Sequence, residues 1–251
     1  MRLDSLTVLT YHSLDTSGSV VSVAPEAFAA QMSALAEAGF RGVSLREALI
    51  YREARNAWPE RCVALTFDDG YANFYESAAP ALARHGFTGT VFVVSGHVGG
   101  RNDWDRPPAG LGLRSMLSWS QIVELSSAGI EIGAHTRRHR DLRRLSMPEA
   151  RGEIVGSRAE IENRLGRSVE SFAYPFGHVS PASLEIVKRE FRVACTTVLR
   201  RAGGEPLHEL PRVDMYYLRA PQRLQRLLDG RLDQYLTIRR LGRMARSALS
   251  L

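Results

Sequence analysis

The sequence predicts an α/β protein built on a parallel sheet, arranged as a barrel or as a doubly wound sheet. Short apolar runs rich in strand formers alternate along the chain with segments in which apolar residues recur at helical spacing. The 251 residues, 44% of them hydrophobic, suit one α/β domain with a large core. The chain length and the number of predicted strands favour the barrel.

Each predicted strand is a short apolar run of the kind that is buried on both faces of a parallel sheet. In chain order the strands cover residues 6–12, 62–67, 90–95, 130–134, 171–176, 192–198 and 210–215. The helices between them begin at residues 25, 44, 71, 118, 146 and 183. Ser44, Ser118 and Ser146 each stand three residues before Glu or Gln, which is the pattern of a capping box. Glycines close several of these helices.

Composition limits the classes of partner and the cellular compartment. The formal net charge is +6, with Arg far more frequent than Lys, which fits an acidic polymer, a nucleic acid, an anionic lipid or an ordinary solvated basic face. No stacking platform of aromatic and basic residues is apparent, so nucleic acid is not expected. Cys62 and Cys195 lie in predicted strands and are interpreted as core residues. With no signal peptide and no membrane span visible, the expected location is cytoplasmic.

Two segments stand apart from the alternating pattern. Residues 96–113 form a long glycine-rich loop with two adjacent prolines, and loops of this length are usually functional or disordered. Residues 220–251 form a basic, Leu-rich tail with apolar residues at helical spacing. This amphipathic helical tail either docks on the domain or lies against an anionic membrane as a peripheral contact. The expected division is therefore a domain of residues 1–219 and a tail of residues 220–251.

Two adjacent carboxylates, Asp68 and Asp69, follow the buried strand 62–67, and Gly70 comes next. Asp-Asp-Gly is also ordinary turn chemistry. Like charges this close resist simultaneous ionisation, and a bound cation would relieve that cost. One carboxylate would then be a ligand, and the other would be free to act as a base.

Histidines add to this pattern at other strand ends. His135 and His139 are four residues apart after the strand 130–134, so one tight loop can aim both rings at one ion. The carboxyl ends of parallel strands gather on one face, where sites form. Two imidazoles and one carboxylate make a ligand set that leaves coordination positions open for water. The His pair together with the Asp pair therefore indicates a metal site.

At this point the sequence resembles the polysaccharide deacetylases, also called NodB-homology or carbohydrate esterase family 4 enzymes. The segments Thr66-Phe-Asp-Asp-Gly70, His135-Thr-Arg-Arg-His139 and Phe172-Ala-Tyr-Pro-Phe-Gly177 look like the family's first three motifs. The resemblance covers about residues 5–215. It implies a distorted (β/α) barrel of about seven parallel strands and a divalent metal, most often Zn²⁺, although Co²⁺, Ni²⁺ and other ions also suit this ligand set.

The resemblance also implies roles for single residues. Asp69, His135 and His139 resemble the metal ligands, and Asp68 resembles the general base. The backbone N–H near Phe176 resembles an oxyanion donor. Tyr174, Pro175 and Phe176 resemble a wall of the substrate groove.

Two departures from the family pattern concern the other catalytic groups. Many members have an arginine that orients the base, where this chain has Ala173. Arg212 is a candidate to approach from a neighbouring strand instead, with Asp214 as another candidate partner for it. The late Leu-x-His motif that supplies the general acid is also missing, and His208 resembles a surface residue. We expect His12, at the end of the first strand, to be the acid, because the first and last strands of a closed barrel are neighbours. This order is similar to the permuted motifs of poly-N-acetylglucosamine deacetylases.

The expected function is hydrolysis of the acetamide of an N-acetylated amino sugar in a polysaccharide or glycan precursor. The alternative is a barrel of the same fold that binds glycan without turning it over. The residues do not specify the sugar, the metal or the oligomeric state.

Overall fold

Eight parallel strands form one sheet in the computed structural model, which describes the backbone of residues 5–249 and the side chains of residues 5–239 and 241. The strands are β1 (Thr7–Tyr11), β2 (Arg41–Val43), β3 (Cys62–Phe67), β4 (Thr90–Val93), β5 (Glu131–Ala134), β6 (Ser171–Ala173), β7 (Val193–Leu199) and β8 (Leu210–Asp214). Their order is β1-β8-β7-β6-β5-β4-β3-β2, and β1 also pairs with β3. Seven strands therefore form the ring, and β2 adds to its outside edge at β3. The seven-stranded barrel is confirmed.

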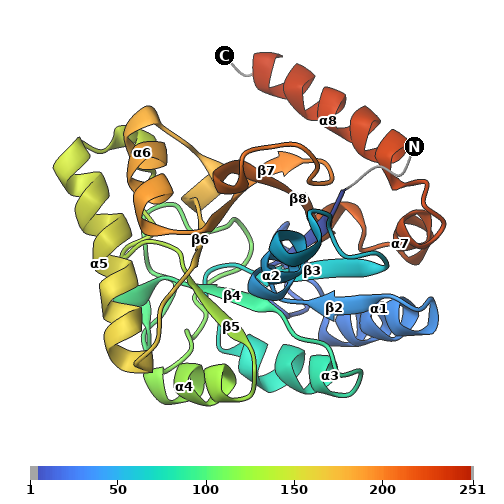
Figure 1. Cartoon of the computed structure of the whole chain (residues 1–251), viewed down its shortest axis with the longest axis horizontal. Helices are drawn as coiled ribbons and strands as arrows, with labels where there is room; N and C mark the ends of the chain where they lie inside the picture. The colour runs from blue at the N-terminus through green and yellow to red at the C-terminus, as the bar shows by residue number, and fades with distance from the viewer. Residues whose placement is uncertain (1–4, 250–251) are drawn as a thin grey trace.

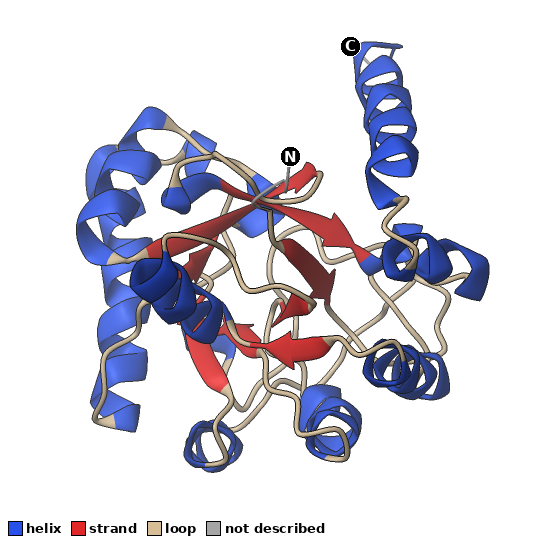
Figure 2. Cartoon of the chain, turned by 45° about the vertical axis from the view of Figure 1, so that its right-hand side comes forward, coloured by secondary structure: helices blue, strands red, loops and turns tan. Residues whose placement is uncertain are grey.

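Helices surround this ring, as Figures 1 and 2 show. They are α1 (Pro25–Glu37), α2 (Leu45–Arg55), α3 (Ala79–Ala83), α4 (Trp119–Ser127), α5 (Met147–Leu165), α6 (Pro181–Glu190), α7 (Pro221–Leu228) and α8 (Leu232–Leu249). The predicted capping boxes at Ser44, Ser118 and Ser146 are all present. Each box satisfies backbone N–H groups that would otherwise lack partners at a helix start.

Strand periodicity separates two layers of the core. Val63, Leu65 and Phe67 of β3 pack with the helix residues Phe28 and Met32 in one hydrophobic cluster. A second cluster holds residues of the opposite strand faces, including Val8, Ala64, Phe92, Ala173, Cys195 and Leu210. Because successive side chains in a strand point to opposite faces, the second set lies on the inner side of the ring.

Three features differ from the sequence prediction. The strand β2 was not predicted, because it has only three residues and includes Gly42. The helix expected from residue 71 is a π-helical segment, Phe74–Ala78, followed by the short α3. Pro80 has no backbone N–H to donate to the preceding turn, which explains the irregular start of α3. Strand β6 ends at Ala173 because Pro175 soon follows.

The segment after β8 packs on the barrel through α7 and the first residues of α8. Leu224, Leu227, Leu232 and Leu236 are all buried and belong to the same cluster as the outer helices. The rest of α8 leads away from the barrel, and Ile238 and Leu241 are exposed (Figure 2). Within the described residues, no helix combines the length and the apolar character needed to cross a membrane.

Candidate active site

Polar side chains face the inside of the barrel at the carboxyl ends of the neighbouring strands β1, β3 and β8. Residue Thr10 of β1 pairs in register with Thr66 of β3 and with Asp214 of β8. Two residues past Thr10 and Thr66, the same alternation places His12 and Asp68 on the inner side at one end of the barrel. Arg212, two residues before Asp214 on β8, reaches Asp68. The site is thus a consequence of parallel register and strand periodicity.

Arg212 binds both oxygens of the Asp68 carboxylate. Its two terminal nitrogens donate to the two Asp68 oxygens at 2.7 and 2.6 Å. The guanidinium also donates to the carbonyl of Thr196 and lies over the ring of Phe92, and its side chain is fully buried. Burial acts to raise the pKa of Asp68, but the charge and hydrogen bonds of Arg212 outweigh burial, and the pKa is lowered. Asp68 is therefore ionised and fixed in orientation. Of the two candidate partners of Arg212, Asp68 is the one that its guanidinium hydrogen-bonds, and the carboxylate of Asp214 accepts from the backbone N–H of Tyr216.

Asp69, His135 and His139 form a compact group beside Asp68. One ligand atom from each lies within 4.8 Å of the other two, and all three side chains are buried. The Nε2 atoms of both histidines are 3.4 Å from the same oxygen of Asp69, Oδ1. This is the one group of three or more potential ligands found among the described residues.

The donor set of this group fits a metal cation. His135 Nδ1 lies 2.7 Å from the carbonyl of Ala173 and donates to it, which leaves Nε2 as the ring atom that faces Asp69 and would ligate a cation. Burial lowers the pKa of His139 to about 4, which keeps this ring neutral at pH 7. The Oδ1 atom of Asp69 is buried and has no hydrogen-bond partner among the described residues. An unsatisfied buried carboxylate oxygen facing two imidazole nitrogens is costly without a cation between them.

His12 lies beside Asp68. Its Nε2 atom is 3.8 Å from Asp68 Oδ2, and 17% of its side chain is exposed. It is therefore close to Asp68 and accessible from outside the barrel. The structure brings all five predicted polar residues, His12, Asp68, Asp69, His135 and His139, to one end of the barrel. Their catalytic and metal-binding roles stay predictions.

The predicted groove wall after β6 is only partly placed at the surface of the site. The side chain of Tyr174 has no exposure and packs on Phe172, and Pro175 is buried as well. Phe176 alone borders the space beside His139, with a ring-centroid separation of 4.7 Å. Phe176 has a φ of +59°, a left-handed conformation that costs about 1 kcal/mol or more in a residue with a side chain. The tight turn therefore aims the ring at the site.

One side chain that packs at the site was not predicted from the sequence. Trp104, in the glycine-rich loop, is buried, and its ring centroid lies 4.8 Å from that of His139. The loop was identified as unusual, and a lone tryptophan in it was the available signal. Two other histidines have partners elsewhere: His178 contacts Asp141 at 3.2 Å, and His208 bonds the carbonyl of Phe191 at 2.8 Å. Neither joins the Asp69 group.

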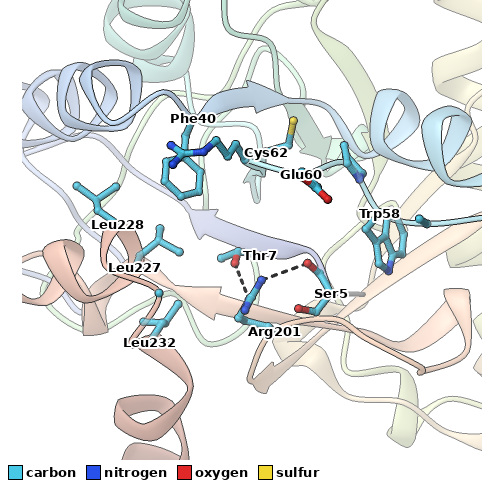
Figure 3. A pocket seen from close by; sticks show the side chains of 14 residues that line it. Ser5, Thr7, Phe40, Trp58, Glu60, Cys62, Arg201, Leu227, Leu228 and Leu232 are labelled. Atoms are coloured by element: carbon cyan, nitrogen blue, oxygen red, sulfur yellow. Dashed lines mark hydrogen bonds between the residues drawn. The ribbon is translucent and has the colours of Figure 1, made fainter. Parts of the chain in front are cut away.

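Two of the cavities on the barrel differ in character. One, of about 250 Å³, borders His139 and Phe176. A larger one, of about 570 Å³, opens near the amino ends of β1 and β3, where Arg201 bonds Thr7 and Ser5 beside Leu227, Leu228 and Leu232 (Figure 3). The candidate metal ligands are absent from the lining of the larger cavity. The smaller cavity adjoins the Asp69 group through His139, which is one of its lining residues.

The sequence was compared with protein families and with curated proteins. The family model described as polysaccharide deacetylase matches residues 55–190, which is more than half of the chain. The Bacillus subtilis protein YxkH is 27% identical over 193 residues, covering 76% of this chain and 64% of the relative. A Staphylococcus aureus poly-β-1,6-N-acetyl-D-glucosamine N-deacetylase is 27% identical over 180 residues, covering 67% of this chain and 58% of the relative. The chain thus spans less than two thirds of these curated relatives.

Solved structures give the same relationship. IcaB from Ammonifex degensii aligns with a TM-score of 0.73 and 28% identity over 91% of this chain and 97% of that one. The Streptococcus pyogenes deacetylase PplD aligns with a TM-score of 0.73 over 84% of this chain and 92% of that one, and its 24% identity bears on the fold alone. The match to the family over residues 55–190, together with the barrel and the motif residues at its end, shows that this chain belongs to the polysaccharide deacetylase family.

Proposed function

We propose that this protein is a metal-dependent N-deacetylase that hydrolyses the acetamide of an N-acetylated amino sugar in a polysaccharide or glycan precursor. The observation that carries the proposal is the pairing of Asp68 with Arg212 beside Asp69, His135 and His139. Family membership and the S. aureus relative support the substrate class.

Each side chain of the site has a step to perform in this reaction. Asp68, ionised and held by Arg212, accepts the proton of the attacking water. His12 donates a proton to the departing sugar amine. Backbone N–H groups in the turn at Phe176 stabilise the developing oxyanion. A divalent cation such as Zn²⁺, held by Asp69, His135 and His139, would supply a Lewis acid that polarises the acetyl carbonyl and acidifies water.

The alternative of a silent glycan-binding barrel was motivated by the alanine at position 173. The structure weakens that motivation, because Arg212 makes the contact with Asp68 that an arginine at position 173 was expected to make. A pure binder also has no need for an ionised buried carboxylate next to the Asp69 group. The enzyme is therefore the function that the geometry supports best.

Acetate release tests the proposal directly. Zinc-loaded wild type, Asp68→Asn and His12→Ala are assayed on β-1,4-linked and β-1,6-linked N-acetylglucosamine oligomers. We expect wild type to release acetate and both variants to lose at least about 100-fold in kcat, since general acid–base groups contribute that much. His85→Ala, which changes a histidine outside the site, is the matched control and should keep wild-type activity. Zinc content measured on each protein separates a lost proton-transfer group from a lost ion.

Three results would contradict parts of this proposal. Acetate release that survives in Asp68→Asn would remove Asp68 as the base. Full activity in His12→Ala would place the acid elsewhere. Oligomer binding without acetate release by zinc-loaded wild type would favour the silent binder.

A further inference from the structure

The 250 Å³ cavity beside His139 runs between two loops that follow β4 and β5. We call it the arginine groove, because Arg106, Arg140 and Arg144 line it. Its inner end is formed by His139 and Phe176, and Leu145 adds an apolar surface farther out. A group in the arginine groove would therefore be a direct neighbour of an acetamide at the Asp69 group.

The positive charges of the arginine groove are poorly compensated. The side chains of Arg106 and Arg144 make no hydrogen bond or ion pair with any residue that the structure describes. Arg140 reaches Glu149 only at 3.4 Å, with both side chains more than 40% exposed, and such a pair is weak.

The two acids of the lining offset only part of this charge. Asp141 is already occupied by Arg143, at 2.8 Å, and by His178, at 3.2 Å. Asp105 is exposed, and among the described side chains it is the one carboxylate of the lining that pairs with no cation. Three guanidinium groups thus face one available carboxylate, in a concave site next to the proposed reaction centre.

We propose that the arginine groove holds an anionic group of the glycan, a phosphate or a carboxylate, while the acetamide of the adjoining amino sugar lies at the Asp69 group. This inference rests on the proposed function and narrows its substrate class to an acidic glycan. Guanidinium groups suit both anions, because their planar N–H donors match pairs of phosphate or carboxylate oxygens. Phe176 and Leu145 offer apolar surface to the intervening sugar ring.

The test compares matched oligomers of N-acetylglucosamine. One is neutral, a second carries a phosphate at O6, and a third carries a carboxylate on the sugar. Dissociation constants are measured with zinc-loaded Asp68→Asn by calorimetry, and KM and kcat are measured with wild type. We expect the phosphorylated oligomer, the carboxylated one or both to bind more tightly than the neutral oligomer. The two anionic arms identify which group the groove prefers.

Variants of the groove arginines test whether the preference for an anionic oligomer arises in the arginine groove. Arg106→Gln and Arg144→Gln should each raise KM for the preferred anionic oligomer by about three- to five-fold, the range of an exposed ion pair. Their kcat and their KM for the neutral oligomer should stay unchanged. Arg189→Gln, on α6, changes net charge equally at a side chain that is 69% exposed, and is the control. Added salt should reduce the difference in wild-type KM between the neutral and the anionic oligomers, because exposed charges are screened.

The outcomes separate this inference from the proposed function. Equal binding of all three oligomers, no binding of any, or an anion preference that survives Arg106→Gln with Arg144→Gln would overturn the groove assignment. An equal rise in KM for the anionic oligomer in Arg189→Gln would also overturn the groove assignment, since net charge alone would then explain the effect. Preferential binding with no acetate release would leave the groove assignment standing and reject the deacetylase.

Discussion

The carboxylate of Asp68 lies inside the barrel with a guanidinium on both of its oxygens. Removing two charges from water is expensive, and their attraction offsets that cost only when the geometry is good and the remaining donors are satisfied. Arg212 meets both conditions, because its Nε atom donates to Thr196 and a terminal nitrogen lies 3.3 Å from the Thr66 hydroxyl. The pair therefore fixes the direction of the proposed base.

Replacing this arginine with lysine keeps the charge and removes the two-pronged contact. We expect Arg212→Lys to lower kcat about 100-fold, because a reacting group displaced by about 1 Å can cost that much. Zinc affinity should be unchanged, since Arg212 does not touch the Asp69 group. Steady-state kinetics with a zinc titration measures both quantities.

Arg201→Lys gives a matched control, because Arg201 binds Ser5 and Thr7 at the other cavity. It should leave kcat unchanged. Wild-type kcat in Arg212→Lys would show that the base needs only a positive charge nearby, and not the fixed geometry.

At the scale of elements, the turn after β6 depends on a glycine. Gly177 has a φ of +70°, and a Cβ placed on it would lie 2.5 Å from the backbone nitrogen of Thr197 and still closer to its hydroxyl. That hydroxyl donates to the carbonyl of Phe176. A side chain at position 177 must therefore push β7 away or move the Phe176 turn.

We expect Gly177→Ala to destabilise the protein by about 3 kcal/mol, adding steric overlap to the strain of a left-handed residue. Gly166→Ala is the control. Gly166 closes α5 with a φ of +65° and has open space around it, so its alanine carries only the strain of about 1 kcal/mol. Urea denaturation measures both values. An equal decrease in the free energy of unfolding in the two variants would mean that the Phe176 turn rearranges around the added methyl group without a further energetic cost.

Elements that depend on residues close together in the sequence could be predicted, and elements that depend on distant pairing could not. The capping boxes were predicted correctly at Ser44, Ser118 and Ser146, because a cap involves residues only three apart. Strand β2 was missed, because three residues with a central glycine carry no periodicity. Its place is set by pairing with β3, a contact across some twenty residues that no local pattern records.

The same distinction applies to the site. Asp68, Asp69, His135 and His139 could be selected from the sequence because they lie in short motifs at strand ends. The contact of Arg212 with Asp68 could only be offered as a guess, because it depends on the register between distant strands. The burial of Tyr174 and the position of Trp104 also depend on how loops pack, which residue type and spacing do not encode.

At the scale of the whole molecule, the segment from residue 220 contributes to the folded core. We expect Leu236→Ala to cost about 3 kcal/mol, the usual penalty for emptying a buried leucine site, because Leu236 is only 1% exposed. Ile238→Ala, on the same helix but 70% exposed, should change stability by about 0.5 kcal/mol or less. Thermal unfolding of both variants checks this. A small effect at both positions would favour an independent tail. Peripheral membrane contact by residues 220–251 stays a prediction.

Metal binding should also stabilise the molecule as a whole. A ligand that binds only the folded state at about 1,000 times its Kd adds about 4 kcal/mol, so zinc should raise the Tm of wild type clearly. Asp69→Asn should abolish this rise, and Asp229→Asn, which changes an exposed aspartate, should keep it. A rise that persists in Asp69→Asn would place the bound zinc elsewhere.

The position of β1 in the ring also affects how the chain folds. β1 pairs with β3, which follows soon after it, and with β8, whose Val213 lies opposite Leu9 across about 200 residues of chain. Contacts between such distant residues are slow to form, because the entropy of the intervening loop must be lost first. The ring therefore closes only after β8 has been synthesised. Since β8 carries Arg212, closure of the ring and neutralisation of Asp68 are the same event, and a nascent chain that lacks β8 exposes both an open sheet edge and an unpaired carboxylate.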